Sequence, residues 1–496
     1  MFGNYTLTPL PPPPPEEVAL LPRLPQARGE LLAAPPAQAG MGAVVLGRMY
    51  RVPAARLPAG WEKREWAALT RVTPYSPPGY GPPPASFRLG HVDAAGDWRI
   101  PKFLGLSLFG PPDRDVRSLG LPMHERCIFT GCMQTGVRDQ VAAHCASLGS
   151  LRACGGALLV LPCGFGKTVV SIAVAASLGR KTLVLVHTGQ LFAQWPERIA
   201  EFAPGARVGG VREGRCDVEE RDFVIAMIQT LQSRRFPPEF YAQFGTTIVD
   251  EAHHTAARTF CATMEEVSSR FILGLTATPE RADRLSHIVN WELGPEAFRA
   301  RRPADAAVRV RTVVYRGGAR EVVMQRNGNV CMSSMYNKLA EEKARTAFIV
   351  RLIENILQSE PRRQLLVLTH RVAHVEELRS ALQSALQSDG CGSVACLRTG
   401  LKGAEREAAM CAQVIVSTYQ LCSEGMDIPS RNTLVLATPK SRVEQTVGRI
   451  QRSTSHREGE CTPLVLDVVD PFSVFAGMAR ARARHYADMG YTVVTQ

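Results

Sequence analysis

An apolar run that ends in a glycine-rich turn constrains the fold of this chain more than any other segment. Residues 157–160 are apolar and lead into the turn 161–168, LPCGFGKT. The pattern predicts a buried strand, a turn whose backbone N–H groups point at an anion, and a helix that begins near Lys167 and adds the positive end of its dipole. In this interpretation Lys167 meets the β- and γ-phosphates of a nucleoside triphosphate, and Thr168 is a ligand of Mg²⁺.

The turn has Leu161 where the usual phosphate-binding pattern has its first glycine, so an ordinary strand-to-helix turn is the alternative. A second segment favours the nucleotide site. Residues 246–249 form a β-branched run that ends in Asp250 and Glu251, and paired carboxylates can hold a metal and polarise an attacking water. The alternative is an acidic pair without catalytic function, in solvent at the start of a helix. The preceding run is too apolar for an exposed edge strand.

The composition limits the class of protein. A chain of 496 residues with 45% apolar residues can build two or three globular domains. Its formal charge of +12 favours a polyanionic partner, without choosing between DNA, RNA and an anionic membrane surface. No apolar run approaches the roughly 18 residues that span a bilayer, and the N-terminus lacks a basic-then-apolar signal. We therefore expect a soluble, intracellular protein that does not bind a membrane.

The cysteines show neither the paired spacing of a disulfide framework nor that of a zinc ribbon. One group is close in sequence: Cys127, Cys132, His144 and Cys145. A metal site would need a tighter pair of cysteines, so small apolar filler residues are the favoured interpretation.

The order of patterns along the chain predicts four parts. Residues 1–45 are a proline-rich arm, either a docking segment or a solubilising tail, and residues 46–121 are a small module of mixed short segments. Residues 122–303 and 304–496 each alternate apolar strands with helix-length segments, which predicts an α/β fold with two tandem parallel sheets and a cleft between them.

The predicted strands of the first sheet are 157–161, 182–186, 223–226, 247–249 and 271–275. Those of the second sheet are 308–314, 365–368, 394–397, 414–417, 433–437 and 464–468. The motifs follow the carboxyl ends of the strands, where open α/β sheets bind ligands.

Residues 445–452 carry a second chemical pattern. Their spacing predicts a helix with Gln445, Arg449 and Arg452 on one face. If that face closes on the first sheet, the two guanidinium groups can stabilise the charge of a γ-phosphate, as an arginine finger within the chain. The alternative is a basic helix face in solvent.

Together these motifs resemble those of a superfamily 2 helicase with two RecA-like domains, over about residues 137–452. The motifs that carry the resemblance stand in the family's order: the glutamine Gln140, the turn 161–168, the segments 190–195 and 229–231, the DEAH-type run 250–253, the Thr-Ala-Thr run 276–278, residues 369–371 and 417–429, and the arginine segment 445–452.

Two narrower resemblances rest on shorter and less specific patterns. Residues 161–164 and 281–283 are similar to the helicase subunit of the transcription and repair factor TFIIH. Residues 100–106, 466–472, 484–486 and 490–491, with the overall length, resemble the poxvirus transcript-release DNA helicase and its relatives in large DNA viruses. The N-terminal third does not match either group well.

The resemblance implies an ATP-dependent DNA helicase or translocase of 3′-to-5′ polarity that acts in transcription or repair, with ATP and Mg²⁺ as cofactors. Its implied ATP-binding residues are Gln140, Pro162, Cys163, Gly164, Phe165, Gly166, Lys167, Thr168, Gly425 and Asp427. Its implied catalytic residues are Lys167, Asp250, Glu251, Gln445, Arg449 and Arg452, with Thr168 and Asp250 on the metal. Nucleic acid would meet Gln194, Thr230 and Thr418, and coupling would pass through His253, Thr276 and Thr278.

Two other functions stay open at this point. The first is an RNA helicase, because the DEAH-type run does not fix the sugar. The second is a non-enzymatic transcription factor that binds DNA or polymerase on the same scaffold. The expected partners are DNA, with RNA as the alternative, and RNA polymerase or transcription factors. For a viral protein we expect the virion and the infected cell's replication and transcription compartment.

Overall fold

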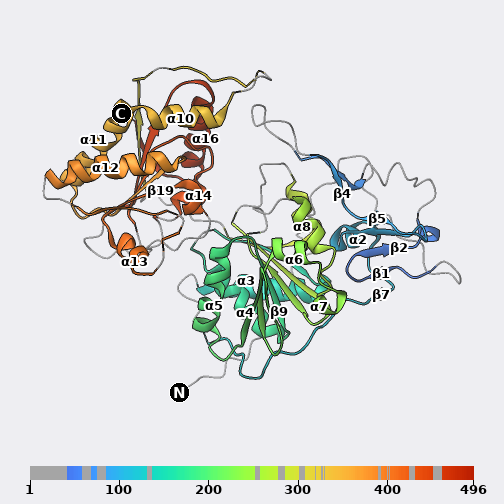
Figure 1. Cartoon of the computed structure of the whole chain (residues 1–496). Coiled ribbons are helices and arrows are strands. Elements are labelled where there is room, and N and C mark those ends of the chain that lie inside the picture. Colours follow the sequence, from blue (N-terminus) through green and yellow to red (C-terminus); the bar gives the residue numbers. More distant parts are fainter. Residues whose placement is uncertain are drawn as a thin grey trace.

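The computed structural model describes residues 42–57, 69–74, 85–130, 137–162, 164–251, 257–277, 285–300, 308–318, 320–325, 328, 330–388, 392–398, 400–401, 403–423, 431–448, 450 and 461–495. Their strands form one small antiparallel-rich sheet, one two-stranded ribbon and two large sheets. Figure 1 shows the second α/β lobe above and to the left of the first, with the small N-terminal module on the other side of the first lobe. Among these residues no helix has the length and apolar character needed to cross a bilayer.

The N-terminal module is built on a five-stranded sheet of order β5-β6-β2-β1-β7. Alternate residues of its strands, Tyr50, Val52, Trp98 and Ile100, are buried against Leu104 and Leu108 of helix α2. The elements are β1 (Val45–Leu46), β2 (Tyr50–Val52), the 3-10 turn η1 (Ala54–Arg56), β3 (Arg71–Val72), β4 (Phe87–Arg88), β5 (His91–Val92), β6 (Trp98–Ile100), α2 (Lys102–Phe109) and β7 (Arg114–Asp115).

The first lobe has an eight-stranded sheet of order β11-β10-β12-β9-β13-β14-β8-β15, in which every pair except β10-β11 is parallel. Its elements are α3 (Val137–Cys154), β8 (Gly156–Val160), α4 (Lys167–Leu178), β9 (Thr182–Val186), α5 (Gly189–Phe202), β10 (Val208–Arg212), β11 (Arg215–Asp217), β12 (Phe223–Met227), α6 (Ile228–Arg234), α7 (Pro238–Ala242), β13 (Thr246–Val249), α8 (Ala257–Met264), β14 (Phe271–Thr276), α9 (Ser286–Leu293) and β15 (Glu296–Arg299).

The second lobe has a seven-stranded, wholly parallel sheet of order β18-β19-β17-β20-β21-β16-β22. Its elements are β16 (Arg309–Val314), α10 (Met332–Glu341), α11 (Lys343–Ser359), β17 (Leu365–Thr369), α12 (Val372–Ser388), β18 (Val394–Cys396), α13 (Gly403–Cys411), β19 (Val414–Thr418), α14 (Tyr419–Ser423), β20 (Thr433–Leu436), α15 (Glu444–Val447), β21 (Leu464–Val469), α16 (Ser473–Asp488) and β22 (Thr492–Thr495).

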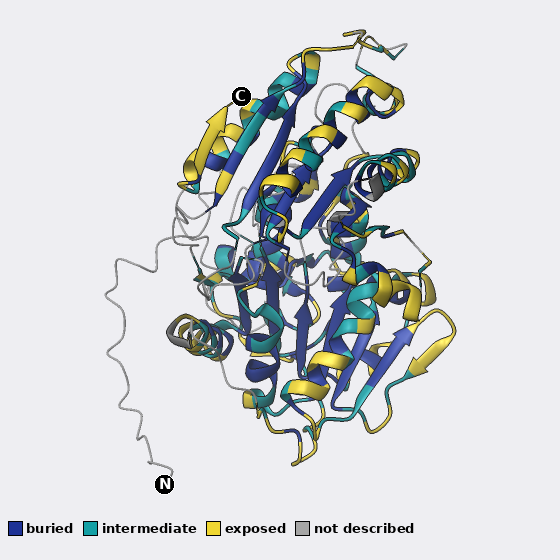
Figure 2. Ribbon diagram, turned by 90° about the vertical axis from the view of Figure 1, so that its left-hand side faces the viewer, coloured by how far each residue is buried: buried dark blue, intermediate teal, exposed yellow. Residues whose placement is uncertain are grey.

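The central strands of both lobes are buried on both faces, which explains why they read as continuous apolar runs (Figure 2). In β8, Leu158 and Val160 join the core on one face, while Ala157 and Leu159 join the core on the other. Strand β17 divides its side chains between two cores in the same way. Each lobe is therefore a three-layer α/β sandwich, and the predicted fold class is confirmed.

The N-terminal module is tied to the first lobe by packing and by a connecting segment. Phe103 of α2 belongs to the core of the first lobe, and the buried ammonium of Lys102 donates to the carbonyl oxygen of Met264 at 2.9 Å. The connecting segment runs along the amino-terminal edge of the sheet and bridges Ser118 to Ser269 and Pro122 to Arg180. These contacts fix the module on the lobe.

The predicted strands of both sheets are present, with bounds within one residue of those expected at either end. Strands β10, β11, β15 and β22 were not predicted. Of the helix predicted over 445–452, residues 445–447 are helical as part of α15, Gly448 and Ile450 lie in a turn, and residues 449, 451 and 452 lie outside the described residues. Glycine is a weak helix former, which accounts for the early end. The boundaries 46–121, 122–303 and 304–496 stay predictions, and the arm up to residue 41 lies outside the described residues.

Candidate functional site in the first lobe

The candidate site lies where three neighbouring strands of the first lobe end. Strands β13, β14 and β8 are adjacent in the sheet, and each is followed by one of the predicted motifs. Thr276, the last residue of β14, pairs with Val160, and its carbonyl oxygen accepts from the backbone N–H of Leu161 at 2.9 Å. Segments far apart in the sequence thus meet at the carboxyl edge, as expected for an open parallel sheet.

The turn after β8 has the backbone of a phosphate-binding loop. Gly164 and Gly166 have φ of 82° and 93°, a region that favours glycine, and helix α4 begins at Lys167 as predicted. The side chain of Gln140 closes the turn from outside, because its Nε2 donates to the carbonyl oxygen of Phe165 at 2.5 Å. A Cβ on Gly166 would lie 2.7 Å from that Nε2, so a larger residue would displace the Gln140 amide and would also be strained by the φ of 93°.

Lys167 and Glu251 form the contact that joins the two motifs. Lys167 Nζ lies 2.7 Å from Glu251 Oε1, and both side chains are mostly buried, with 13% and 18% of their surface exposed. Glu251 has φ of 48°, an unusual conformation for a residue with a side chain. Strained backbone of this kind clusters at functional sites, and here it aims the carboxylate at the lysine.

Asp250 lies deeper than Glu251. Its side chain is buried, its Oδ2 accepts from the indole N–H of Trp195 at 3.0 Å, and its backbone N–H donates to Leu185 O at 3.1 Å. Burial, together with the carboxylate of Glu251, raises the pKa of Asp250 to about 6, against the opposing effects of Lys167 and of the Trp195 hydrogen bond. A cation beside Asp250 would therefore be strongly favoured.

One buried acceptor at the site has no partner. Oε1 of Gln140 is buried and makes no hydrogen bond with any residue that the structure describes. A buried amide oxygen of this kind is costly unless a donor meets it. It marks a place where a ligand with an N–H group would be stabilised.

Metal ligands are limited at this edge. Within the described ranges no group of three or more His, Cys, Asp and Glu side chains could hold an ion. Thr168, beside Lys167 on α4, and Asp250 fit a Mg²⁺ ion that also binds phosphate oxygens, since Mg²⁺ commonly takes one or two protein ligands plus phosphates.

The cysteine and histidine group near residue 127 is a separate matter. Cys127 is buried and its thiol lies 3.6 Å from the sulfur of Met123, while His144 Nε2 is 3.0 Å from the hydroxyl of Ser177. Cys132 lies outside the described residues. Cys127 is packed as a filler residue would be, whereas Cys145 is exposed, so the interpretation of the group as small apolar fillers is not met at Cys145.

The predicted nucleic-acid residues occupy the carboxyl edges of both sheets. Thr230 on α6 is 7% exposed, and its hydroxyl accepts from the backbone N–H of Glu213 at 3.3 Å. Thr418 ends β19 and caps α14, since its hydroxyl accepts from Leu421 N at 3.2 Å. Gln194 is half-buried on α5. Both hydroxyls act as acceptors in these bonds, which leaves their protons for donation to a phosphate. The contacts of these residues with nucleic acid stay predictions.

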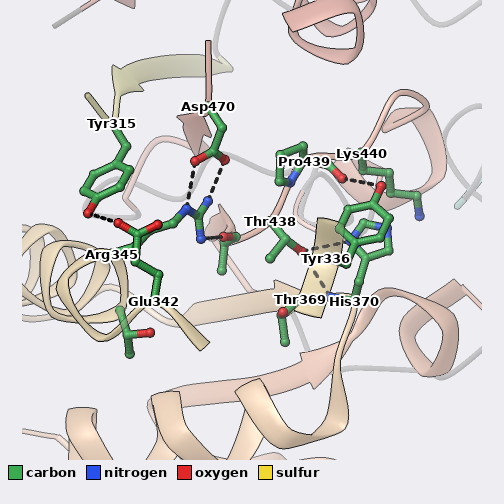
Figure 3. A network of polar contacts seen from close by, with 12 residues as sticks. Tyr315, Tyr336, Glu342, Arg345, Thr369, His370, Thr438, Pro439, Lys440 and Asp470 are labelled. Carbon is green, nitrogen blue, oxygen red and sulfur yellow. Dashed lines mark hydrogen bonds and ion pairs between the residues drawn. The ribbon is translucent and has the colours of Figure 1, made fainter. Parts of the chain in front are cut away.

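The carboxyl edge of the second sheet carries a dense polar network (Figure 3). His370 stacks on Tyr336 with ring centres 3.9 Å apart, and its Nδ1 lies 2.9 Å from the hydroxyl of Thr438. Tyr336 donates to the carbonyl oxygen of Pro439 at 3.1 Å. Burial, with Lys440 and Arg371 nearby, lowers the pKa of His370 to about 3, so this imidazole is neutral at physiological pH.

A fully buried ion pair lies beside this network. Arg345 makes two bonds of 2.8 Å to Asp470 and one of 2.7 Å to the carbonyl oxygen of Ala437 (Figure 3). The pair ties α11 to the end of β21 and to the residue after β20. It holds in place the loops that follow these strands.

Several predicted site residues lie outside the described residues: Cys163, His253, Thr278, Gly425, Asp427, Arg449, Arg452 and the side chain of Gln445. Their roles stay predictions. Thr276, the described coupling residue, is fully buried at the end of β14.

Comparisons with known proteins agree with this geometry. The family described as "Type III restriction enzyme, res subunit" matches residues 137–281, which carry the turn, the carboxylates and the end of β14. The "Putative ATP-dependent RNA helicase L396" of Acanthamoeba polyphaga mimivirus is 29% identical over 79% of this chain and 75% of its own length. The chain is similar to superfamily 2 helicases over most of its length.

Two further relatives support this likeness. The "Putative ATP-dependent RNA helicase QP509L" of African swine fever virus (strain Badajoz 1971 Vero-adapted) is 26% identical, over 68% of this chain and 69% of its own length. "Probable helicase D10" of Escherichia phage T5 is 25% identical, over 67% and 72%. The resemblance to helicases of large DNA viruses is confirmed, and the enzyme class is that of a nucleic-acid-dependent ATPase.

The helicase fold is supported by a solved structure. A fragment of "a putative HsdR subunit of a type I restriction enzyme" from Vibrio vulnificus YJ016 matches with a TM-score of 0.51 and 19% identity, over 75% of this chain and 72% of that one. At this identity the match concerns the fold alone, two tandem RecA-like lobes.

Sequence reasoning missed residues that support the helicase site. Trp195, which holds Asp250, stood within a segment assigned to nucleic-acid contact. A buried indole needs an acceptor, and the inward spacing of Trp195 and Ile199 on α5 was the available signal. The Thr438 partner of His370 and the Arg345–Asp470 pair had no signal, because they join residues 68 and 125 positions apart that share no local pattern.

Proposed function

We propose that this chain is an ATP-dependent DNA helicase or translocase of 3′-to-5′ polarity that acts in transcription, as a transcript-release factor, or in repair. The observation that supports the proposal most is the 2.7 Å contact of Lys167 with Glu251, above the buried carboxylate of Asp250. A cation for phosphate, a base for water and a metal ligand meet at one point, which is the set that ATP hydrolysis requires.

Lys167 and the turn hold the triphosphate in this proposal. The backbone N–H groups of residues 163–168 surround the phosphate oxygens at the start of α4, and Pro162, which has no N–H, forms the corner of the turn. A phosphate oxygen competes with Glu251 for Lys167, and this releases the carboxylate. The orphan Oε1 of Gln140 fits the amino group of adenine.

The remaining roles in hydrolysis follow from position. Glu251 positions the attacking water and takes its proton. Thr168 and Asp250 hold Mg²⁺, which when bound neutralises charge on the phosphate oxygens. Asp250 suits this task because its buried carboxylate accepts one strong hydrogen bond, from Trp195, and because a nearby cation would stabilise its charged form.

Residues of the second lobe complete the proposed site across the cleft. Arg449 and Arg452 stabilise the charge that spreads over the transferred phosphoryl group, with Gln445 beside them. Gly425 and Asp427 contact the nucleotide from the same lobe. Loss of the γ-phosphate then removes an anion that both lobes hold, and the lobes separate.

Movement of the lobes is passed to nucleic acid through contacts with phosphates. Gln194 and Thr230 on the first lobe and Thr418 on the second bind the backbone without reading sequence. Thr276, Thr278 and His253 couple these contacts to the carboxylates. Separating one base-pair step costs about 1.4 kcal/mol of stacking, so one hydrolysis event can drive a step of that size.

An RNA helicase is the second candidate. Two viral relatives carry the name RNA helicase, which favours this candidate over a non-enzymatic factor. RNA polymerase or another transcription factor is the proposed protein partner in either case.

The test combines two assays on the purified full chain. ATP hydrolysis is measured with single-stranded DNA and RNA of one sequence as alternative stimulants, and strand displacement on DNA duplexes with a 3′ or a 5′ tail. The proposal expects stimulation by DNA and displacement from the 3′ tail. Stimulation by RNA alone selects the second candidate, and the absence of any stimulated hydrolysis refutes both.

A further inference from the structure

The two-stranded ribbon β3-β4 of the N-terminal module places two arginines opposite each other. Arg71 pairs directly with Arg88, and both side chains are exposed. In the antiparallel register, Leu89 N donates to Thr70 O at 2.9 Å, so the adjacent Arg71–Arg88 pair is of the non-hydrogen-bonded kind, in which side chains stand closest.

Neither guanidinium group meets a counter-ion within the described part of the chain. Among the residues that the structure describes, Arg71 and Arg88 have no ion pair and no side-chain hydrogen bond, and the two strands carry no acidic residue. Like charges directly opposite on a sheet repel each other. The arrangement weakens the ribbon unless an anion binds between the two side chains.

A pair of hydroxyls continues the same face. The hydroxyls of Thr73 and Ser86 lie 2.9 Å apart, one ladder step of two residues beyond the arginines, and both residues are exposed. Two guanidinium groups followed by two hydroxyls are the side-chain types that proteins use to contact the sugar-phosphate backbone.

The other face of the ribbon fixes it to the first lobe. Val72 and Leu89 are 3% and 0% exposed and belong to the core that contains Met264 of α8. The backbone N–H of Gly90 also donates to Glu265, just beyond α8, at 3.4 Å. The arginines therefore point away from the lobe on a rigid support.

The ribbon adjoins the proposed nucleic-acid edge of the first lobe. Helix α8 contacts α6, where Gln232 Nε2 donates to the hydroxyl of Thr263 at 3.2 Å, and α6 carries Thr230. The ribbon, α8 and α6 thus form one continuous series of elements (Figure 1).

We propose that the exposed face of the β3-β4 ribbon is a second binding site for the nucleic-acid backbone, in which Arg71 and Arg88 hold one or two phosphates that Thr73 and Ser86 help to position. This inference rests on the proposed nucleic-acid-dependent function and extends it to the N-terminal module. The N-terminal module then also binds the strand that enters or leaves the two lobes.

The test measures binding of the full chain to a fluorescent tailed DNA duplex over a range of salt concentrations. For Arg71→Ala with Arg88→Ala, loss of two phosphate contacts lowers the slope of log affinity against log salt by about 1.8 for duplex DNA, or about 1.4 for a single strand. Affinity at low salt falls about tenfold or more, and ATP hydrolysis without nucleic acid is unchanged. Arg71→Lys with Arg88→Lys retains most of the slope.

A matched control replaces two exposed arginines at the amino-terminal edge of the second sheet, the edge opposite the polar network. Arg309 opens β16 and Arg362 precedes β17, so Arg309→Ala with Arg362→Ala should leave the slope unchanged. Thermal unfolding gives a second readout: removing the facing charges on the ribbon should not lower the melting temperature. A ribbon variant with the parental slope overturns the inference. A parent chain that neither binds nor responds to nucleic acid instead refutes the proposed function, so the two failures are distinct.

Discussion

The carboxyl edges of the two large sheets are built differently, although both sheets are parallel and both are followed by polar loops. At the first edge Lys167 and Glu251 are mostly buried but keep 13% and 18% of their side-chain surface exposed, and a strained backbone holds the carboxylate. At the second edge Arg345 and Asp470 are sealed, with exposed fractions of 0% and 1%. Charges that must exchange partners stay within reach of a ligand, whereas charges that fix loops are buried and fully satisfied.

The contrast implies that equivalent substitutions act on different quantities. Removing a charge at the first edge should change turnover and leave stability almost intact. Removing a charge at the second edge should lower the free energy of unfolding more than it changes turnover. Each of the following experiments tests one side of this division.

The largest expected effect is on turnover in the first lobe. Glu251→Gln keeps the shape and removes the base, so we expect nucleic-acid-stimulated hydrolysis to fall by about 10²- to 10⁴-fold. Lys167→Ala should abolish stimulated hydrolysis as well, while DNA binding stays largely intact in both variants. Steady-state ATPase assays and anisotropy binding measure the two properties. Parental hydrolysis in either variant would show that the assigned roles are wrong.

The next effect concerns stability in the second lobe. Arg345→Met leaves the carboxylate of Asp470 buried without its partner, and breaking a buried pair in this way costs about 3–5 kcal/mol of unfolding free energy. Denaturant unfolding followed by circular dichroism measures the loss. The double variant Arg345→Met with Asp470→Leu should recover part of it, because no buried charge then remains. An equal loss in the double variant would mean that packing, and not charge, governs this edge.

Acidification should also separate the two edges. His374 is fully buried between the hydroxyls of Thr346 and Thr369, and burial, aided by Arg345, lowers its pKa to about 3. Its folded pKa lies below the unfolded value near 6.5, so the unfolded chain binds the extra proton. Stability is full above about pH 6.5 and falls by about 1.4 kcal/mol per pH unit as the pH drops toward 3.

Urea unfolding at pH 7 and pH 5 measures this loss, about 2 kcal/mol for His374 alone. His374→Gln should flatten the dependence. The buried Asp250 at the first edge contributes with the opposite sign, since its raised pKa lets the folded chain bind a proton below about pH 6. If His374→Gln loses as much stability between pH 7 and pH 5 as the parent does, the assignment of a neutral, buried His374 is contradicted.

The two edges also differ in how far the sequence predicts them. The motifs of the first edge were found because they are short local patterns: a glycine pair before Lys167 and two carboxylates after an apolar strand. Their place at the carboxyl edge was predicted from the fold class, whereas the Lys167–Glu251 contact was not predicted and the roles of these residues stay predictions. Trp195 was not assigned to this site, because it belongs to no local phosphate or carboxylate pattern and reaches Asp250 only through the packing of α5.

The second edge was predicted only as a sheet. Its strands were found because they are apolar runs buried on both faces. Its polar pairs join residues such as Arg345 and Asp470 that share no local pattern, and only the packing of α11 against the sheet brings them together. The terminal strand β22 was missed for a physical reason too: its residues are exposed, so it lacks the apolar signature of its neighbours.

The smallest effect tests whether Trp195 belongs to the chemistry of the first edge or only to its packing. Trp195→Phe keeps an aromatic ring on α5 but removes the N–H that Asp250 accepts. That bond holds down the pKa of Asp250, so its loss should weaken the carboxylate as a metal ligand. Supporting hydrogen bonds of this kind are worth about tenfold in metal affinity, and we expect the Mg²⁺ concentration for half-maximal hydrolysis to rise by about that factor.

The control for Trp195 lies on the same helix. Phe192 packs against the same core without contacting Asp250, so Phe192→Leu should lower stability slightly and leave the Mg²⁺ requirement unchanged. If Trp195→Phe behaves like Phe192→Leu, then Trp195 only fills space. The indole would then play no part in the chemistry of the first edge. The charged form of Asp250 would be stabilised by Lys167 and the metal alone.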